Sequence, residues 1–335
     1  MSALVNLAER GIFPDALLRA GIRRLISKRK RYLQHGIGVV EPGALEQLAL
    51  AVHTDKANEQ HYEVPSALFE HALGPRLKYS SCYYPTAKTT LAEAEDAMLA
   101  LSGKHAMLED GQDVLELGCG WGSLTLWMAE HYPSSRITAM SNSASQRDFI
   151  LARAKDRGLT NVNVLTEDFN HFETSNQFDR VVSVEMFEHL QNWGTAFKRV
   201  ASWLKPDGRA FLHVFCHRDY AYLFEGNDNW MARHFFTGGL MPAFDLPGAF
   251  NRDLVVEDQR WIPGEHYART ANDWLREFDA ATAALTPLLT ATYASEADTW
   301  RQRWRLFFLA VAEMFGYDEG NLWGIGHYRL KRTSP

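Results

Sequence analysis

The strongest constraint on the fold of this 335-residue chain comes from one stretch, VLELGCGWG at residues 114–122. Residues 114–117 form a mainly apolar run that predicts a buried strand, and a helical apolar pattern follows the glycines directly. Glycines let the backbone approach a ligand closely, and the first turn of a helix presents free N–H groups. The stretch therefore predicts a cradle of nucleotide size; the alternative is a tight strand-to-helix turn without a ligand.

A dinucleotide is disfavoured as the ligand of this cradle. The fingerprint G-x-G-x-x-G requires a glycine at position 123, where the chain has Ser123. The next predicted strand ends in Ser141 and Asn142, without the acidic residue that holds the ribose of NAD. The pattern ELGCGWG resembles instead the first motif of methyltransferases that use S-adenosylmethionine.

From residue 112 onward, strand patterns alternate with helix patterns, which predicts an α/β fold with a doubly wound parallel sheet. The expected strands lie near residues 112–117, 136–140, 162–166, 179–184 and 209–215, and the expected helices near 121–132, 144–157 and 187–204. A turn at residues 205–208 separates the last of these helices from the strand that follows it. Ligands of such sheets bind beyond the carboxyl ends of the strands, so the residues that follow each strand are the candidate site.

Two segments precede this core, and we place the boundary at residue 86. Residues 14–35 predict an amphipathic helix with a basic face, which could lie on a membrane or pack on its own domain. A second helix is expected at 44–52. Residues 55–86 carry four tyrosines and a Cys-Ser cluster, and we expect them to close over the ligand unless they are a surface loop.

The chain beyond residue 215 interrupts the alternation. Residues 216–265 are rich in aromatic residues and glycine, and a long insertion at the ligand edge of a sheet predicts a substrate cap. Helices are expected near 270–291 and 297–316. A final strand at about 322–331 is expected to add antiparallel to the edge of the sheet. We therefore divide the chain into 1–86, 87–215 and 216–335.

Composition excludes several classes of function. A net charge of −6 gives no reason to expect a nucleic acid partner. Cys82, Cys119 and Cys216 are far apart and odd in number, which favours a reduced, cytoplasmic protein without disulfides or a zinc site. No apolar run approaches the roughly 20 residues of a membrane span, and we expect no signal peptide. The sequence leaves open a homodimer.

The richest set of reactive side chains follows the fourth predicted strand, in SVEMFEH at residues 183–189. If this segment is helical, Glu185, Glu188 and His189 share one side of the helix through their i, i+3 and i, i+4 spacing. An amine that accepts a methyl group must be unprotonated, which calls for a carboxylate or an imidazole nearby. The alternative is that acidic residues here only stabilise a helix N-terminus.

Several motifs in order give a resemblance that is more specific than the glycine turn. HYEVP (61–65), KYSS (78–81), ELGCGWG (116–122) and VEMFEH (184–189) resemble the cyclopropane fatty acid synthase family of methyltransferases. Within it, FFTGGLMP (235–242), HYART (266–270) and AEMFGY (312–317) are most similar to the coclaurine N-methyltransferase-like branch. The resemblance implies a class I methyltransferase (Rossmann-like) fold with an antiparallel last strand, and S-adenosyl-L-methionine as cofactor.

The resemblance also implies roles for individual residues. The implied cofactor contacts are Tyr79 and Ser80 at the methionine end, Glu116, Gly118 and Gly120 in the loop, Ser141, Asn142 and Gln146 near the ribose, and Asp168 and Phe169 at the adenine. Glu188 and His189 match an acid–histidine pair beside the acceptor. We expect Glu188 to hold an incoming ammonium and His189 to take its proton.

Departures from the family pattern bear on the substrate. Cyclopropane synthases hold a bicarbonate ion with a Glu, a His, a Tyr and two backbone groups, and Glu188, His213 and Tyr267 match the three side chains. Ser81 and Phe215 depart from the usual residues, and Glu185 stands where those enzymes usually have glycine.

An extra carboxylate suits a cationic amine better than an anion, because like charges repel. The leading hypothesis is N-methylation of a small aromatic or alkaloid-like amine. The alternative is a synthase that adds a cyclopropane or methyl branch to an unsaturated fatty acyl phospholipid chain, with peripheral membrane contact. A third is a non-catalytic cofactor sensor.

Overall fold

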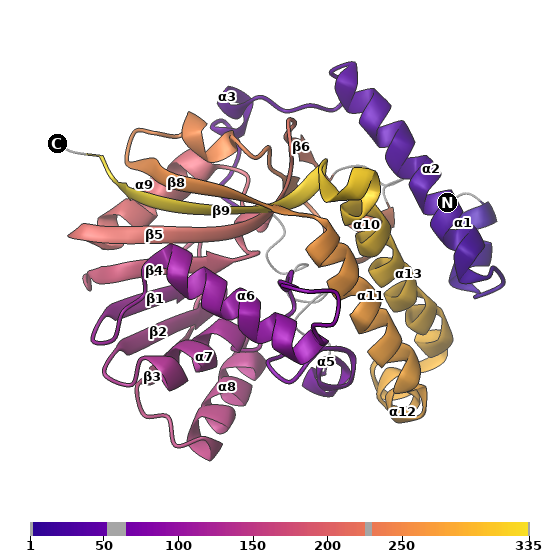
Figure 1. The fold of residues 1–335 in the computed structure, drawn as a ribbon, viewed down its shortest axis with the longest axis horizontal. Coiled ribbons are helices and arrows are strands. Elements are labelled where there is room, and N and C mark those ends of the chain that lie inside the picture. Colours follow the sequence, from indigo (N-terminus) through magenta and orange to yellow (C-terminus); the bar gives the residue numbers. More distant parts are fainter. Residues whose placement is uncertain (1–2, 52–64, 225–229, 334–335) are drawn as a thin grey trace.

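A seven-stranded sheet forms the centre of the molecule (Figure 1). The structure is a computed structural model, which describes residues 3–51, 65–224 and 230–333. The strand order is β3-β2-β1-β4-β5-β9-β8, with β1 to β5 parallel to one another and β9 antiparallel to both β5 and β8. The strands are β1 Asp113–Leu117, β2 Arg136–Ser141, β3 Val162–Thr166, β4 Phe178–Val184, β5 Leu204–His217, β8 Leu254–Pro263 and β9 Trp323–Arg332. The predicted α/β sheet with an antiparallel last strand is confirmed.

Helices cover both faces of the sheet because alternate strand residues point to opposite sides. Val114 and Val182 pack with α6 (Leu91–Ala106) and α7 (Ser123–His131), and α8 (Ala144–Asp156) covers the neighbouring strands β2 and β3. Leu115 and Val181 face the other way, toward α9 (Trp193–Trp203). The carboxyl ends of the parallel strands are thereby held in place at one edge.

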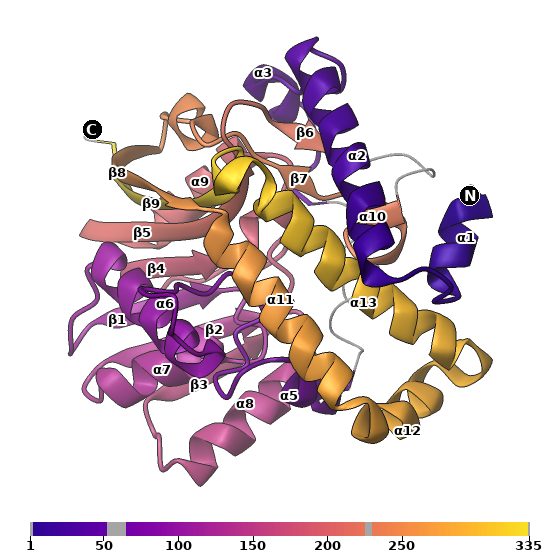
Figure 2. The same ribbon diagram turned by 45° about the vertical axis from the view of Figure 1, so that its right-hand side comes forward.

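A second layer of helices lies beyond that edge. It comprises α1 Ala3–Glu9, α2 Asp15–Gln34, α5 Ser66–Ala72, α10 Trp230–His234, α11 Glu265–Ala280, α12 Thr282–Tyr293 and α13 Ala297–Phe315. Figure 2 shows α2 lying across α13, with α11 beside α13 and α12 joining those two at one end. Short strands β6 (Tyr222–Leu223) and β7 (Leu240–Met241) complete the cap region.

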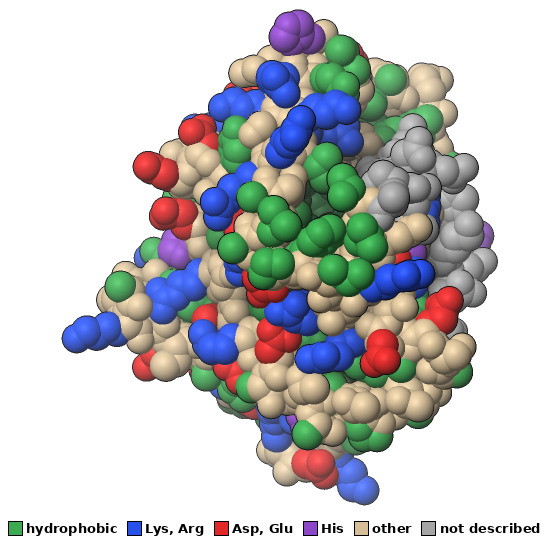
Figure 3. All heavy atoms as spheres, turned by 90° about the vertical axis from the view of Figure 1, so that its right-hand side faces the viewer, with side chains coloured by type: hydrophobic (Ala, Val, Ile, Leu, Met, Phe, Trp, Pro, Cys, Tyr) green, Lys and Arg blue, Asp and Glu red, His purple; other side chains and the backbone are tan. Residues whose placement is uncertain are grey.

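The basic helix predicted at 14–35 is present as α2 and packs on its own molecule. Arg19 and Arg23 both form ion pairs with Glu313 of α13. The predicted apolar face is only partly covered, since Ile26 is buried whereas Leu17 and Leu25 are 54% and 67% exposed. On the face drawn in Figure 3, hydrophobic side chains lie among lysines and arginines. None of the helices in the described ranges is long and apolar enough to cross a bilayer.

Four expectations about elements were wrong. The helix expected at 187–204 is a 3-10 turn, η1 (Phe187–His189), followed by a break and then α9. The helix expected at 44–52 is the single turn α3 (Pro42–Leu45), and the helix expected at 270–291 is two helices, α11 and α12. The seventh strand β8, which lies at the sheet edge outside β9, was missed, so the predicted cap 216–265 contains part of the sheet. The motif HYEVP falls on residues 61–65, of which only Pro65 is described.

Candidate active site

The turn between β1 and α7 leaves open space at one glycine only. Gly118, Gly120 and Gly122 all have positive φ, at 73°, 51° and 82°. A Cβ on Gly118 would lie 2.6 Å from Met186 Cγ, and one on Gly122 would lie 2.6 Å from a side-chain carbon of Ile150. A Cβ on Gly120 would meet nothing within 4 Å. Gly118 and Gly122 therefore serve close packing, whereas Gly120 opens the cradle.

A cavity of about 160 Å³ extends from this turn to an aromatic wall. The end at the turn is lined by Tyr79, Ser80, Glu116, Gly118, Gly120 and Gln146, all of them predicted cofactor contacts. The other end is lined by Phe215, Phe224, Met231, Phe236, Phe307, Val311, Met314 and Phe315. Glu185, His189 and Tyr267 line the cavity as well. The structure thus brings predicted cofactor contacts and apolar side chains together around Glu185, His189 and Tyr267.

The polar end fits a nucleoside. Ser141 Oγ donates to Gln146 Oε1 at 2.6 Å, so the predicted hydroxyl and amide do lie together. Gln146 Nε2 is buried and has no hydrogen-bond partner among the described residues, which suits a ribose hydroxyl. Glu116 accepts a hydrogen bond from Thr125, and burial raises the pKa of Glu116 to about 8. These residues would hold S-adenosylmethionine.

Four predicted cofactor contacts lie outside the set that lines the cavity, namely Ser141, Asn142, Asp168 and Phe169. Asn142 follows Ser141 at the end of β2. Asp168 Oδ1 accepts from the Asn170 backbone N–H at 2.8 Å and so shapes its own turn. Phe169 is buried and packs edge-on against Trp203, with the ring centroids 5.9 Å apart. Their roles in cofactor binding stay predictions.

Glu185 is the best-connected polar residue of the site. Its Oε1 accepts a hydrogen bond from the Ser81 backbone N–H at 2.9 Å and lies 3.2 Å from His213 Nε2, within hydrogen-bond distance. Its Oε2 accepts from Tyr267 Oη at 2.7 Å. The backbone of Glu185 has a φ of 48°, a conformation that costs a non-glycine residue of order 1–3 kcal/mol and persists only where its surroundings fix it. Three hydrogen bonds, with Ser81, His213 and Tyr267 from separate parts of the sequence, supply that constraint.

Lys78 is a residue of this site that the sequence reading missed, although it begins the KYSS motif. The side chain is buried, and its Nζ donates to Ser80 Oγ at 2.5 Å and to the Ser81 carbonyl at 2.7 Å. Burial raises the pKa of Glu185, while the Lys78 charge and the hydrogen bonds from Ser81 and Tyr267 oppose that rise. Burial lowers the pKa of Lys78. A basic residue within the motif could have been read as a partner for the extra carboxylate.

Glu188 lies behind the cavity wall, which corrects the predicted shared side. Because residues 187–189 form a 3-10 turn, Glu185 and His189 line the cavity and Glu188 does not. Glu188 Oε1 accepts from the Phe215 backbone N–H at 2.6 Å, and its buried Oε2 has no hydrogen-bond partner among the described residues. Burial and the neighbouring Glu185 raise the pKa of Glu188 well above its usual value. Glu185 has more hydrogen-bond donors than Glu188, so the directions of the two pKa shifts favour the proton on Glu188.

The location of the proton on Glu188 rather than on Glu185 gives a first prediction. Glu188→Gln should change kcat/KM by less than about tenfold, or about 1.4 kcal/mol, because glutamine is a neutral near-isostere of the protonated acid. Glu188→Ala, which also removes the acceptor of the Phe215 N–H, should lower it further. Steady-state kinetics of both variants check this. A glutamine variant as inactive as the alanine variant would show that Glu188 acts as an anion.

The sheet and the glycine turn define a class I methyltransferase that uses S-adenosylmethionine. A family model described as "Mycolic acid cyclopropane synthetase" matches residues 51–325, and the chain belongs to this family. The chain is 34% identical to the (S)-coclaurine N-methyltransferase of Thalictrum flavum subsp. glaucum, over 98% of this chain and 95% of that protein. It is 30% identical to the cyclopropane-fatty-acyl-phospholipid synthase of Escherichia coli (strain K12), over 80% of this chain and 66% of that protein.

A solved structure of a related enzyme agrees with the sequence comparison. The crystal structure of a coclaurine N-methyltransferase bound to N-methylheliamine and SAH superimposes with a TM-score of 0.93 at 32% identity. The match covers 98% of each chain. The predicted family, the enzyme class and the cofactor are confirmed by these comparisons.

Proposed function

We propose that this protein transfers the methyl group of S-adenosylmethionine to the nitrogen of a small aromatic, alkaloid-like amine. The observation that carries the proposal is the hydrogen bonding of Glu185 in the wall of a cavity that predicted cofactor contacts and aromatic side chains both line. A carboxylate there attracts an ammonium, and aromatic ring faces beside it favour a cation as well. The related N-methyltransferases support the choice of an amine.

The same hydrogen bonds argue against the lipid alternative. The resemblance assigns His213, Tyr267 and backbone groups to a bicarbonate ion in cyclopropane synthases. In this chain Tyr267 and the Ser81 N–H donate to Glu185, and His213 Nε2 forms a hydrogen bond with the same carboxyl group. Because the pKa of Tyr267 is raised well above its usual value, chiefly by burial, its phenol stays a donor. The Glu185 carboxylate thus takes up donors that a bicarbonate ion would need.

S-adenosylmethionine supplies a methyl group already activated by its sulfonium, so the chain mainly has to position the acceptor and control its proton. Glu185 holds the amine beside the cofactor end of the cavity. His189 lies on the cavity wall against Phe236, with ring centroids 4.6 Å apart, and takes the proton that the amine must lose. The rings at the apolar end exclude water from the nitrogen.

His189→Ala should lower kcat by about 10²–10⁴-fold, the usual contribution of a positioned acid–base group. The wild-type rate should rise with pH as the general base loses its proton, and the part of this rise that His189 contributes should be absent in the variant. Affinity for S-adenosylmethionine should stay nearly unchanged. An effect confined to KM, with an unaltered pH profile, would show that His189 only orients the amine.

The proposed reaction is tested by product identification. The enzyme is incubated with S-adenosylmethionine and either a panel of aromatic amines or vesicles of unsaturated phospholipid, and products are analysed by mass spectrometry. We expect N-methylated amines and no modified acyl chains. Turnover on lipid with none on any amine would contradict the proposal, and absence of S-adenosylhomocysteine formation with either class would favour a cofactor sensor.

We further propose a cytoplasmic location. Cys82, Cys119 and Cys216 are buried free thiols, which supports a compartment in which thiols stay reduced. Subcellular fractionation, with a membrane wash at high salt, would test this location and the peripheral membrane contact of the lipid alternative together.

A further inference from the structure

Three histidines form a hydrogen-bonded chain that leads away from Glu185. His213 Nε2 lies 3.2 Å from Glu185 Oε1, and His213 Nδ1 lies 2.9 Å from His327 Nε2. His327 Nδ1 lies in turn 2.8 Å from His105 Nδ1. The residues come from β5, β9 and α6, and His213 and His327 face each other in the antiparallel register of β5 and β9. All three are buried, with 0%, 1% and 8% of their surfaces exposed.

The chemistry of imidazole gives this chain a direction. Burial lowers the pKa of His213 and of His327 well below the usual value and that of His105 to about 4, so all three rings are neutral. A neutral imidazole has one N–H donor and one acceptor nitrogen. Each of the three hydrogen bonds between His105 and Glu185 uses one proton, and each ring has one. The direction of the hydrogen bond at one end therefore fixes the tautomer of all three rings.

We propose that His327 and His105 are positioning residues that fix the tautomer of His213, so that His213 always donates to Glu185. In this arrangement the Nδ1 proton of His105 bonds to His327, and the Nε2 proton of His327 bonds to His213. The Nε2 proton of His213 is then directed at Glu185. The role in catalysis rests on the proposed function, because it assumes that an ionised Glu185 holds the amine.

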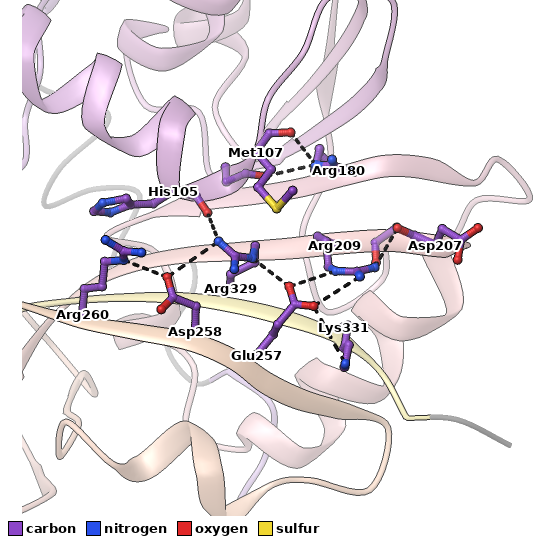
Figure 4. Close-up of polar contacts among 12 residues, drawn as sticks. His105, Met107, Arg180, Asp207, Arg209, Glu257, Asp258, Arg260, Arg329 and Lys331 are labelled. Carbon is purple, nitrogen blue, oxygen red and sulfur yellow. Dashed lines mark hydrogen bonds and ion pairs between the residues drawn. The ribbon is translucent and has the colours of Figure 1, made fainter.

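The charges around the chain favour this direction. At the inner end, Glu185 accepts from Ser81 and Tyr267, with Glu188 and the Lys78 cation nearby. At the outer end, Figure 4 shows His105 beside the ion pairs of β8 and β9. Arg260 and Arg329 there, and Lys104 on α6, disfavour protonation of His105 more than Asp258 favours it. An unprotonated outer nitrogen on His105 agrees with the proposed direction.

Sequence reasoning assigned His213 from the resemblance and did not single out His327 or His105. In the sequence, His327 lies 114 residues from His213, and His105 lies 222 residues from His327. His327 belongs to a strand whose alternating pattern predicts only that its side chain faces one side of the sheet. Only the register of β5 with β9 shows that this side is that of His213.

Histidine ¹⁵N NMR of the wild type with bound S-adenosylhomocysteine tests the proposal without any substrate. We expect His213 and His327 to be protonated at Nε2 and bare at Nδ1. A doubly protonated ring, or protonation at Nδ1 of either residue, would overturn the proposal even if the enzyme methylates amines. Conversely, the expected shifts in a protein without amine turnover would separate the tautomer chain from the proposed function.

Two variants at His327 test the functional consequence. His327→Gln places an amide N–H near the position of Nε2, whereas His327→Leu cannot donate. In the leucine variant, loss of the His327 donor should raise the pH at which Glu185 loses its charge, and so the acid limb of kcat/KM, by about one pH unit. At a pH below this limb, kcat/KM should therefore be about tenfold lower than in the wild type. The glutamine variant should keep the wild-type limb, and so should His131→Leu, a histidine outside the chain. Equal limbs in the leucine and glutamine variants would overturn the proposal.

If the His327 variants do not fold, a second pair of variants can be made at His105, the outer end of the histidine chain. His105 is nearer to the surface, and His105→Asn retains an N–H close to the position of Nδ1, while His105→Leu does not. The asparagine variant should keep the wild-type ¹⁵N shifts of His327, and the leucine variant should change them. Identical spectra would show that His105 has no part in setting the tautomers.

Discussion

Glu185→Gln should lower kcat/KM for the amine by about 10²–10⁴-fold, the range typical of a positioned acid–base group. The substitution keeps the size of the side chain and removes the charge that attracts the ammonium. It also gives His213 and Tyr267 a poorer acceptor than the carboxylate to which they now donate. Because burial raises the pKa of Glu185, ionisation is lost as the pH falls through that raised value. The limb that Glu185 contributes to the pH profile of kcat/KM, separate from the contribution of His189, should therefore lie above the usual carboxylate range.

Two controls separate the charge of Glu185 from the stability of its surroundings. Glu188→Gln removes a neighbouring carboxyl group by the same chemical change, and it should retain most of the activity. Calorimetry should show that Glu185→Gln binds S-adenosylmethionine about as well as the wild type, since the predicted cofactor contacts are other residues. Amine turnover near the wild-type rate in Glu185→Gln would remove Glu185 from the proposed role.

Gly120→Val should abolish measurable binding of S-adenosylmethionine. The Cβ would meet no protein atom within 4 Å, so the added side chain would extend into the cradle and exclude the ligand. A positive φ of 51° adds backbone strain of about 1–3 kcal/mol. Isothermal titration calorimetry measures the binding, and the melting temperature measures the strain.

A matched control for this strain exists at Gly158. It has a φ of 68°, and a Cβ there also meets nothing within 4 Å, but it lies in the turn after α8, outside the set of cavity-lining residues. Gly158→Val should lower the melting temperature to a similar degree and leave binding intact. Unchanged affinity in a folded Gly120→Val variant would refute the assignment of the cofactor site.

The parallel strands were predictable because their sequences are short apolar runs bounded by turns. The edge strand β8 was not, because Glu257, Asp258 and Arg260 in its middle are charged and form ion pairs. Glu257, for example, pairs with Arg329 of the adjacent strand β9 and with Arg209 of β5, the strand beyond β9. A strand stabilised in this way lacks the apolar signature of a buried strand.

The break before α9 depends on a contact that is distant in sequence. The Gln191 backbone N–H donates to the Leu50 carbonyl, and Asn192 caps α9 by accepting from the Thr195 N–H. The apolar spacing alone continues through these residues, so it predicted one unbroken helix. The asparagine cap was the local indication of where α9 begins.

The motifs located the candidate site, but they could not show which of its side chains line the cavity and which form hydrogen bonds with one another. Glu185, His213 and Tyr267 come from the end of β4, from β5 and from α11, and only the fold brings them together. The resemblance assigned the amine contact to Glu188. The left-handed backbone at Glu185 and the 3-10 turn after it place Glu185, and not Glu188, on the cavity wall, and neither conformation is encoded by a glycine.

The proposal depends most on the claim that the Glu185 carboxylate takes the donors that a cyclopropane synthase offers to bicarbonate. The direct measurement is the initial rate of amine methylation in buffer freed of carbon dioxide and then titrated with bicarbonate. We predict a full rate without bicarbonate and no stimulation at any concentration. A rate that falls to background without bicarbonate and is restored by its addition would contradict the proposal.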